Sequence, residues 1–122
     1  MMKKLFLLLI MATLGCSNDD DNQRYCTEEF VFGLVVTVKN AETGAELQEG
    51  VTVVAADGSY SETLQLGYSG ASTFIGAGER RGNYILTVAK AGFETYVSQP
   101  VTVNADECHV ITERITVELQ PE

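Results

Sequence analysis

The sequence predicts an all-β fold, a single antiparallel β-sandwich of about seven strands. Apolar and polar residues alternate with a period of two from Phe30 onward, so successive side chains would point to opposite faces of a strand. Turn residues separate these short apolar segments, and no segment repeats its apolar residues with the period of a helix. The 122 residues, 45% apolar and 20% charged, suit one globular domain without internal repeats.

The first two predicted strands alternate clearly. The first covers residues 30–39, and its apolar face consists of Phe32, Leu34, Val36 and Val38. Turn residues at 40–44 end this strand. The second strand has a shorter inward row, made of Val51, Val53 and Ala55. The dipeptide Asp57-Gly58 follows and is typical of a tight hairpin.

The middle of the chain carries weaker strand signals than its two flanks. Residues 60–66 and 72–75 are short strand candidates, separated by a turn at 67–70. Residues 76–82 are expected to form a loop that carries one glutamate and two arginines.

Alternation returns in the last third of the chain. Tyr84, Leu86 and Val88 alternate with Ile85, Thr87 and Ala89, and the apolar row Ile115, Val117 and Leu119 ends the chain. Residues 93–97 and 101–103 are expected to be short strands between these rows. Pro100 breaks the strand there or places it on a sheet edge, because proline has no N–H to donate.

Residues 1–15 read as a secretory signal peptide that is removed. Lys3 and Lys4 precede an apolar run at 5–12, which is the order of a positive and an apolar region in such signals. The run is shorter than the roughly 20 apolar residues that span a bilayer. The alternative is a buried N-terminal element of the domain, which the strongly polar stretch at 17–24 disfavours.

Residues 13–16, Thr13-Leu14-Gly15-Cys16, resemble the lipobox of bacterial lipoproteins, in which a peptidase cuts before a cysteine that becomes diacylated. Gly15 and Cys16 match this motif, whereas Thr13 stands where the family prefers leucine. The resemblance implies a lipid anchor at Cys16 and a location in the bacterial cell envelope, at the outer membrane. The alternative is an ordinary secretory signal followed by an incidental cysteine.

Residues 16–28 are expected to form the lipidated cysteine and an acidic tether. Positions 17–24 contain no apolar residue and cannot contribute to a core. The Ser/Asp-rich start of this tether resembles the export signal of surface-exposed lipoproteins of the Bacteroidota, and a plain spacer is the alternative. The aspartates at 19–21 lack the spaced ligands and the glycine of a calcium-binding loop.

The cysteine count supports an exported protein. Acylation of Cys16 leaves Cys26 and Cys108, the other two of the three cysteines, as a pair in an oxidising compartment. A disulfide that closes so long a loop stabilises a fold by roughly 4 kcal/mol on chain-entropy grounds. Zinc would need more ligands than these two cysteines and His109 supply.

Two parts of the chain resemble the carboxypeptidase regulatory-like domain family. The first reads VTVKNAETG at 36–44 and continues through Leu47 and 50–53, and the second reads GNYILTV at 82–88, followed by Gly92-Phe93 and 101–103. The resemblance covers 32–119 and implies a transthyretin-like or immunoglobulin-like sandwich of about seven strands for a domain at 29–120. It departs at 66–82, which is longer than, and different from, the family's D-x-x-G-x-F/Y hairpin.

Charge excludes nucleic acid as a partner. The formal charge is −9, from 8 basic and 17 acidic residues. Two of the basic residues leave with the signal peptide, so 6 basic side chains then face 17 acidic ones, a net charge of −11. Nucleic acid binding depends on clustered lysine and arginine.

The sequence contains no recognisable catalytic motif: neither G-x-S-x-G nor H-E-x-x-H nor a phosphate-binding glycine loop occurs. The single histidine, His109, is expected in a strand as a surface or packing residue beside Cys108. Neighbours on a strand point to opposite faces, which disfavours a Cys-His catalytic pair. The acidic pairs Glu28-Glu29 and Asp106-Glu107 are expected to be solvated rather than glycosidase carboxylates.

The candidate binding residues are aromatic and basic. Tyr60, Tyr68 and Phe74 are expected near loops, where aromatic rings can stack on sugars or peptides. Arg80 and Arg81 can recognise a carboxylate or a phosphate. The alternatives are part-buried strand positions for the aromatic residues and a solvated loop tip for the arginines.

Together these features predict a non-catalytic, membrane-anchored lipoprotein whose sandwich is an accessory module that binds a protein or glycan of the envelope. The family resemblance implies the same role, since such domains accompany peptidases and outer-membrane transporters. The alternative is a structural or adhesion component that pairs with other chains. We expect no cofactor and no metal site.

Overall fold

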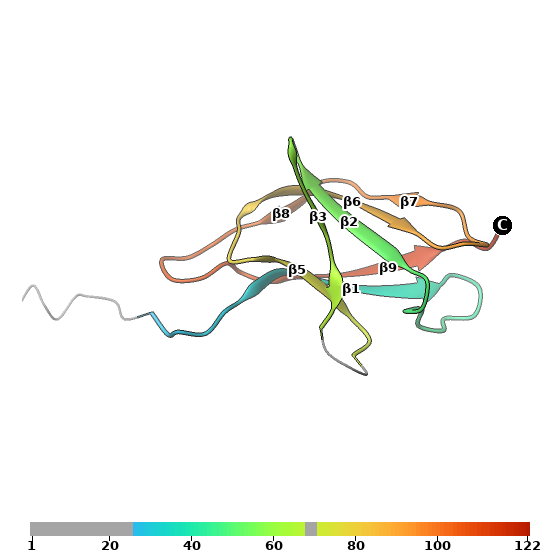
Figure 1. Cartoon of the computed structure of the whole chain (residues 1–122), viewed down its shortest axis with the longest axis horizontal. Coiled ribbons are helices and arrows are strands. Elements are labelled where there is room, and N and C mark those ends of the chain that lie inside the picture. Colours follow the sequence, from blue (N-terminus) through green and yellow to red (C-terminus); the bar gives the residue numbers. More distant parts are fainter. Residues whose placement is uncertain (1–25, 68–70) are drawn as a thin grey trace, which may run out of the picture.

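The computed structural model describes residues 26–67 and 71–122, and this part of the chain is all-β without helices (Figure 1). Its nine strands are β1 (Phe32–Asn40), β2 (Thr52–Asp57), β3 (Tyr60–Thr63), β4 (Gln65–Leu66), β5 (Phe74–Gly78), β6 (Gly82–Ala89), β7 (Tyr96–Val97), β8 (Val101–Val103) and β9 (Glu113–Leu119). The predicted signal peptide, Cys16 and most of the acidic tether lie outside the described residues.

The strands form two sheets, which lie one over the other in Figure 1. The β1 sheet has the order β4-β5-β1-β9. The β6 sheet has the order β3-β2-β6-β7, and β8 also pairs with β6. The two-layer all-β fold that the sequence predicts is therefore present.

One strand pair differs from the predicted antiparallel sandwich. β9 runs parallel to β1, from Leu34 opposite Glu113 to Asn40 opposite Leu119. All the other pairs in the described part are antiparallel. A parallel pair needs a long crossover, which here is the whole intervening domain, returned by residues 104–112 to the end where β1 begins. The alternation of apolar and polar residues along β9 cannot reveal this direction, because it is the same in a parallel and in an antiparallel strand.

The predicted strand at 60–66 divides at Leu64. β3 pairs with β2 in one sheet, and β4 pairs with β5 in the other. Leu64 lies at the crossing, where its N–H donates to Val53 O and its side chain is buried. The predicted strand at 93–97 is shorter than expected, since only Tyr96–Val97 is a strand.

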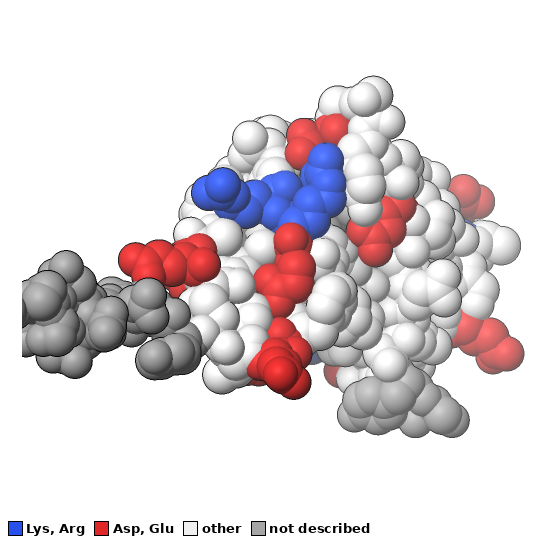
Figure 2. Space-filling view, turned by 60° about the vertical axis from the view of Figure 1, so that its left-hand side comes forward, with Lys and Arg blue, Asp and Glu red and all other residues white. Residues whose placement is uncertain are grey.

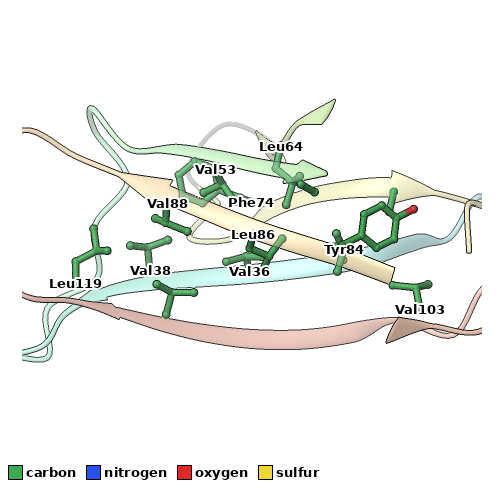
Figure 3. Packing of buried hydrophobic residues seen from close by; sticks show 14 of the residues in the cluster. Val36, Val38, Val53, Leu64, Phe74, Tyr84, Leu86, Val88, Val103 and Leu119 are labelled. Atoms are coloured by element: carbon green, nitrogen blue, oxygen red, sulfur yellow. The ribbon is translucent and has the colours of Figure 1, made fainter. Parts of the chain in front are cut away.

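The core lies between the sheets and contains most of the predicted inward rows (Figure 3). The fully buried side chains include Leu34, Val36, Val38, Val53, Tyr84, Leu86, Val88, Val117 and Leu119. Phe32 is the exception in its row: it is half-buried, and its ring meets Phe30 edge to face with centroids 5.2 Å apart. Period-two alternation therefore identifies the core, because every second side chain on a strand faces the opposite sheet.

No helix in residues 26–67 and 71–122 has the length and apolar composition needed to cross a membrane.

Candidate functional site

A disulfide joins the start of the described chain to the loop between β8 and β9. Cys26 and Cys108 are bridged across 82 positions, with their Cα atoms 5.2 Å apart, a distance that a disulfide spans readily. This confirms the predicted pairing. It also brings the N-terminal segment to one end of the sandwich, where the β5–β6 turn and the β2–β3 hairpin also lie.

Glu79, in the β5–β6 turn, is the centre of this end. Ala77 and Glu79 have φ angles of +54° and +48°, in the left-handed region that residues other than glycine rarely adopt. The Glu79 carboxylate accepts hydrogen bonds from the backbone N–H of Val31 (3.0 Å) and of Val110 (3.2 Å). His109 Nδ1 lies 2.6 Å from the same carboxylate. Glu79 therefore ties the N-terminal segment and the β8–β9 loop to the turn.

His109 does not lie in a strand, so the sequence prediction was wrong on this point. It occupies a bend in the β8–β9 loop. Its ring contacts Glu79 through Nδ1 and the Thr27 hydroxyl through Nε2, at 3.0 Å. Sequence reasoning missed this cluster because its three members are far apart in the chain and no motif links them.

Glu79 and His109 shift each other's pKa. The hydrogen bond to Glu79 raises the pKa of His109, against the opposing effect of partial burial. Partial burial opposes ionisation of Glu79, but the hydrogen bonds from His109 and from two backbone N–H groups outweigh it and lower the pKa of this carboxyl. The contact therefore favours the charged form of each group.

The order hydroxyl, imidazole, carboxylate is also that of a catalytic triad. In the structure these three groups tie the N-terminal segment, the β8–β9 loop and the β5–β6 turn together, and we call them the His109–Glu79 clamp. The hydrogen bond to Glu79 raises the pKa of His109 and so favours its protonated form, which is a poorer proton acceptor for Thr27. The backbone N–H groups of Cys108 and His109 donate to Asp106 Oδ1 at 2.8 and 2.9 Å, which removes them as donors to an oxyanion.

The side chain of Arg80 is held by contacts within the domain. Its guanidinium lies 3.7 Å from the centroid of the Tyr60 ring, which is a cation–π contact. Its Nη1 donates to Asp57 Oδ2 at 3.1 Å and to the Tyr84 hydroxyl at 3.0 Å. Gly82 makes room for this arrangement, since a Cβ there would lie 2.5 Å from Asp57 Oδ2. Arg80 thus fastens the hairpin to the turn.

The side chain of Tyr60 is also held by contacts within the domain. Its hydroxyl donates to Glu62 Oε1 at 2.9 Å, and this hydrogen bond raises the pKa of Tyr60. The Arg80 guanidinium lies over its ring. The structure therefore brings Tyr60 and Arg80 together, but each is occupied by the other and by its own hydrogen bonds.

Arg81 differs from its neighbour. Its side chain is exposed and makes no hydrogen bond or ion pair with any residue of the described ranges. It borders an open hollow of about 470 Å³. We call this the end hollow; it is lined by Glu79, Arg80, Arg81, Ala105, Asp106, Glu107, Cys108, His109 and Val110. Figure 2, which turns this end forward, shows a basic patch with acidic side chains around it.

Of the remaining candidate residues, those that the structure describes do not line the end hollow. Phe74 is 4% exposed and belongs to the core at the start of β5, so it takes the strand position that was the alternative to a loop aromatic. Period two alone does not say whether a residue at a strand start is buried. Tyr68 lies outside the described residues, as does Cys16. Glu28 and Glu29 are exposed on the N-terminal segment.

No group of three or more His, Cys, Asp or Glu side chains suited to a metal ion occurs in residues 26–67 and 71–122. No family model matches the chain, and no curated protein is similar to it.

Proposed function

We propose that the protein is a non-catalytic lipoprotein of the bacterial cell envelope, anchored through Cys16, which binds a protein partner at the end hollow. The observation that carries this proposal is the difference between its two arginines. Arg80 is held by Asp57, Tyr60 and Tyr84, whereas Arg81 borders the hollow without a partner in the described part of the chain. An exposed guanidinium beside a hollow is suited to bidentate recognition of a carboxylate.

The surroundings of Arg81 favour a protein over a sugar. Glu79, Asp106 and Glu107 border the same hollow, so its charge is mixed. Among the described residues, the hollow is lined by no Phe, Tyr or Trp, and the nearby Tyr60 ring is covered by Arg80, so the large aromatic faces that suit sugar stacking are not offered there. The mature chain, with 6 basic against 17 acidic residues, has a net charge of −11 that attracts a basic surface. We infer a partner that is basic overall and offers one carboxylate to Arg81.

The anchor restricts where this partner lies. Nine residues lie between Cys16 and Cys26, and the ten Cα-to-Cα steps from one cysteine to the other reach at most about 35 Å. Because Cys26 is bridged to Cys108, a residue of the end hollow, a lipid on Cys16 holds the hollow within about that distance of the membrane. The resemblance to carboxypeptidase regulatory-like domains agrees, since those domains accompany outer-membrane transporters.

Replacement of Arg81 tests the site. Cells that produce the wild-type protein, Arg81→Ala or Arg114→Ala are treated with a chemical cross-linker, and the protein is purified from detergent-solubilised envelopes. Arg114 is the control because it is an exposed arginine on β9, away from the hollow. We expect Arg81→Ala to reduce partner recovery about 10- to 100-fold, the range for one charge-assisted contact, and Arg114→Ala to leave it unchanged.

Two results would contradict the proposal in different ways. Equal recovery from the two variants would remove Arg81 and the end hollow as the site. The absence of any cross-linked partner with the wild-type protein would remove the binding function itself.

A further inference from the structure

The outer face of the β6 sheet contains no charged residue. In β2 and β6 the buried residues alternate with residues that point away from the core, and the strand register extends this outer row onto β3, β7 and β8. We call this surface the β6 face. It consists of Thr52, Val54, Ala56, Ser61, Thr63, Asn83, Ile85, Thr87, Ala89, Val97 and Thr102.

The charged residues of these strands are placed on the other side. Asp57 and Glu62 follow the register of buried Ala55, not that of the outer row. Asp57 pairs with Arg80, and Glu62 accepts hydrogen bonds from Tyr60 and from the N–H of Ala77. β6, β7 and β8 contain no charged residue at all.

The β1 sheet shows that this depletion is specific to one face. Its outer row follows the register in which Thr37 is opposite Thr116 and Lys39 is opposite Glu118. Arg114 and Glu118 are exposed there. In a chain with 25 charged residues among 122, the outer face of the β1 sheet thus carries charged residues and the strands of the β6 sheet place none on their outer face.

In its lack of charge the β6 face resembles the centre of an interface. Val54, Ile85 and Thr87 lie at its middle and are partly exposed, and Val97 beside them is 62% exposed. Hydroxyl and amide side chains such as Thr63, Asn83 and Thr102 surround them. Depletion of charge at the centre of a contact, with polar groups at its rim, distinguishes protein interfaces from ordinary surface.

We propose that the β6 face pairs with the β6 face of a second copy of this chain, around a two-fold axis. Charge selects this occupant. Two mature copies, each with 6 basic against 17 acidic residues and so a charge of −11, repel one another, and a contact through charged surface would add like-charge pairs to that repulsion. A two-fold contact places each surface against itself, and the β6 face brings no charge against any other when it does so.

Size determines the strength of this pairing. Four strand positions at about 4.8 Å and a β6 length of 8 residues at about 3.3 Å give a face of about 20 by 25 Å. Each copy would therefore bury about 500 Å², and the pair about 1,000 Å², which is below the size of permanent dimers. We expect a reversible dimer with a dissociation constant in the micromolar to millimolar range.

The pairing is independent of the proposed function. The β6 face and the end hollow share no residue, so a substitution on the face leaves the residues of the hollow unchanged. Loss of one property leaves the other measurable.

Sedimentation equilibrium of the mature-length chain with Cys16→Ala, at up to about 1 mM, tests the pairing. Thr87→Asp places one carboxylate on the middle of each β6 face, so the two-fold contact would bury two. We expect the dimer dissociation constant to rise at least about 100-fold. Thr116→Asp is the matched control, because it makes the same change on the outer face of β9. We expect it to alter the constant by less than about threefold.

A second substitution controls for the possibility that Thr87→Asp disturbs the fold. Val97→Asp changes a side chain that is already 62% exposed and should weaken the dimer as Thr87→Asp does, with an unchanged circular dichroism spectrum. Added salt should strengthen the wild-type dimer, since it screens the repulsion between the two acidic copies. A wild-type chain that stays monomeric at about 1 mM, or equal weakening by Thr87→Asp and Thr116→Asp, would overturn the proposal.

Discussion

Removal of the Cys26–Cys108 disulfide should lower the free energy of unfolding by at most about 4.5 kcal/mol. The bridge closes a loop with a sequence separation of 82, and the chain-entropy relation assigns a loop of that length about 4.5 kcal/mol at 25 °C. This value is an upper limit, because engineered and natural bridges often contribute less. The effect acts on the unfolded chain, which becomes freer without the bridge.

The native fold should survive the removal. Cys26 is exposed and outside the core, and the hydrogen bond from Val31 to Glu79, which does not involve the bridge, is expected to persist without it. The test compares the chain carrying Cys16→Ala with the same chain carrying Cys26→Ser and Cys108→Ser. Urea unfolding is followed by circular dichroism, because the chain contains no tryptophan for fluorescence.

The parent chain under reducing conditions is the control and should match the double serine variant. A loss below about 1 kcal/mol would refute the chain-entropy reasoning. Loss of the native circular dichroism spectrum in the serine variant would show that the bridge is needed to form the fold, which is also contrary to this expectation.

Two further predictions concern the core and the His109–Glu79 clamp. Leu86→Ala should cost about 2–5 kcal/mol in urea unfolding, because Leu86 is fully buried between the sheets; a cost below about 1 kcal/mol would contradict its place in the core. The raised pKa of His109 contributes stability that is present below its usual 6.5 and is lost as the pH rises through the folded-state value. The lowered pKa of Glu79 contributes stability that is present above its usual 4.5 and is lost as the pH falls through the folded-state value. The stability advantage of the wild-type chain over Glu79→Gln should therefore be greatest between about pH 4.5 and 6.5, and a difference that is constant from pH 4 to 9 would rule out the clamp.

The sequence predicted the layers of this fold but not every strand direction. Period two assigns Val36, Leu86 and Val117 to the core because burial of alternate side chains is a local consequence of the strand. The parallel pairing of β9 with β1 depends on how residues 104–112 return the chain, which no local pattern encodes. The division of 60–66 at Leu64 likewise depends on the tertiary structure, because the first part of this segment pairs with β2 in one sheet and the second part pairs with β5 in the other.

The candidate site was predictable only in part. Cysteine parity identified Cys26 and Cys108 without geometry, because only one pair remains after acylation of Cys16. Arg80 and Arg81 are adjacent and identical in chemistry, so only the position of Asp57 and Tyr60 separates the structural arginine from the exposed one.

The His109 clamp shows the same limit. Glu79 and His109 are 30 positions apart, and each looks like an ordinary surface residue in the sequence. One signal was present: the glutamate sits between glycine and arginine in a short turn, where a strained backbone is common.

Site-specific photo-cross-linking in intact cells would test the binding function most directly. A photoreactive residue replaces Glu107, which is exposed and borders the end hollow, or Thr116, which is exposed on the outer face of β9. We expect a discrete adduct with another envelope protein from position 107 and none from position 116. Addition of Arg81→Ala should reduce the adduct from position 107 at least about tenfold. Adducts of equal yield from both positions, or an adduct from position 107 that persists without Arg81, would contradict a partner site at the end hollow.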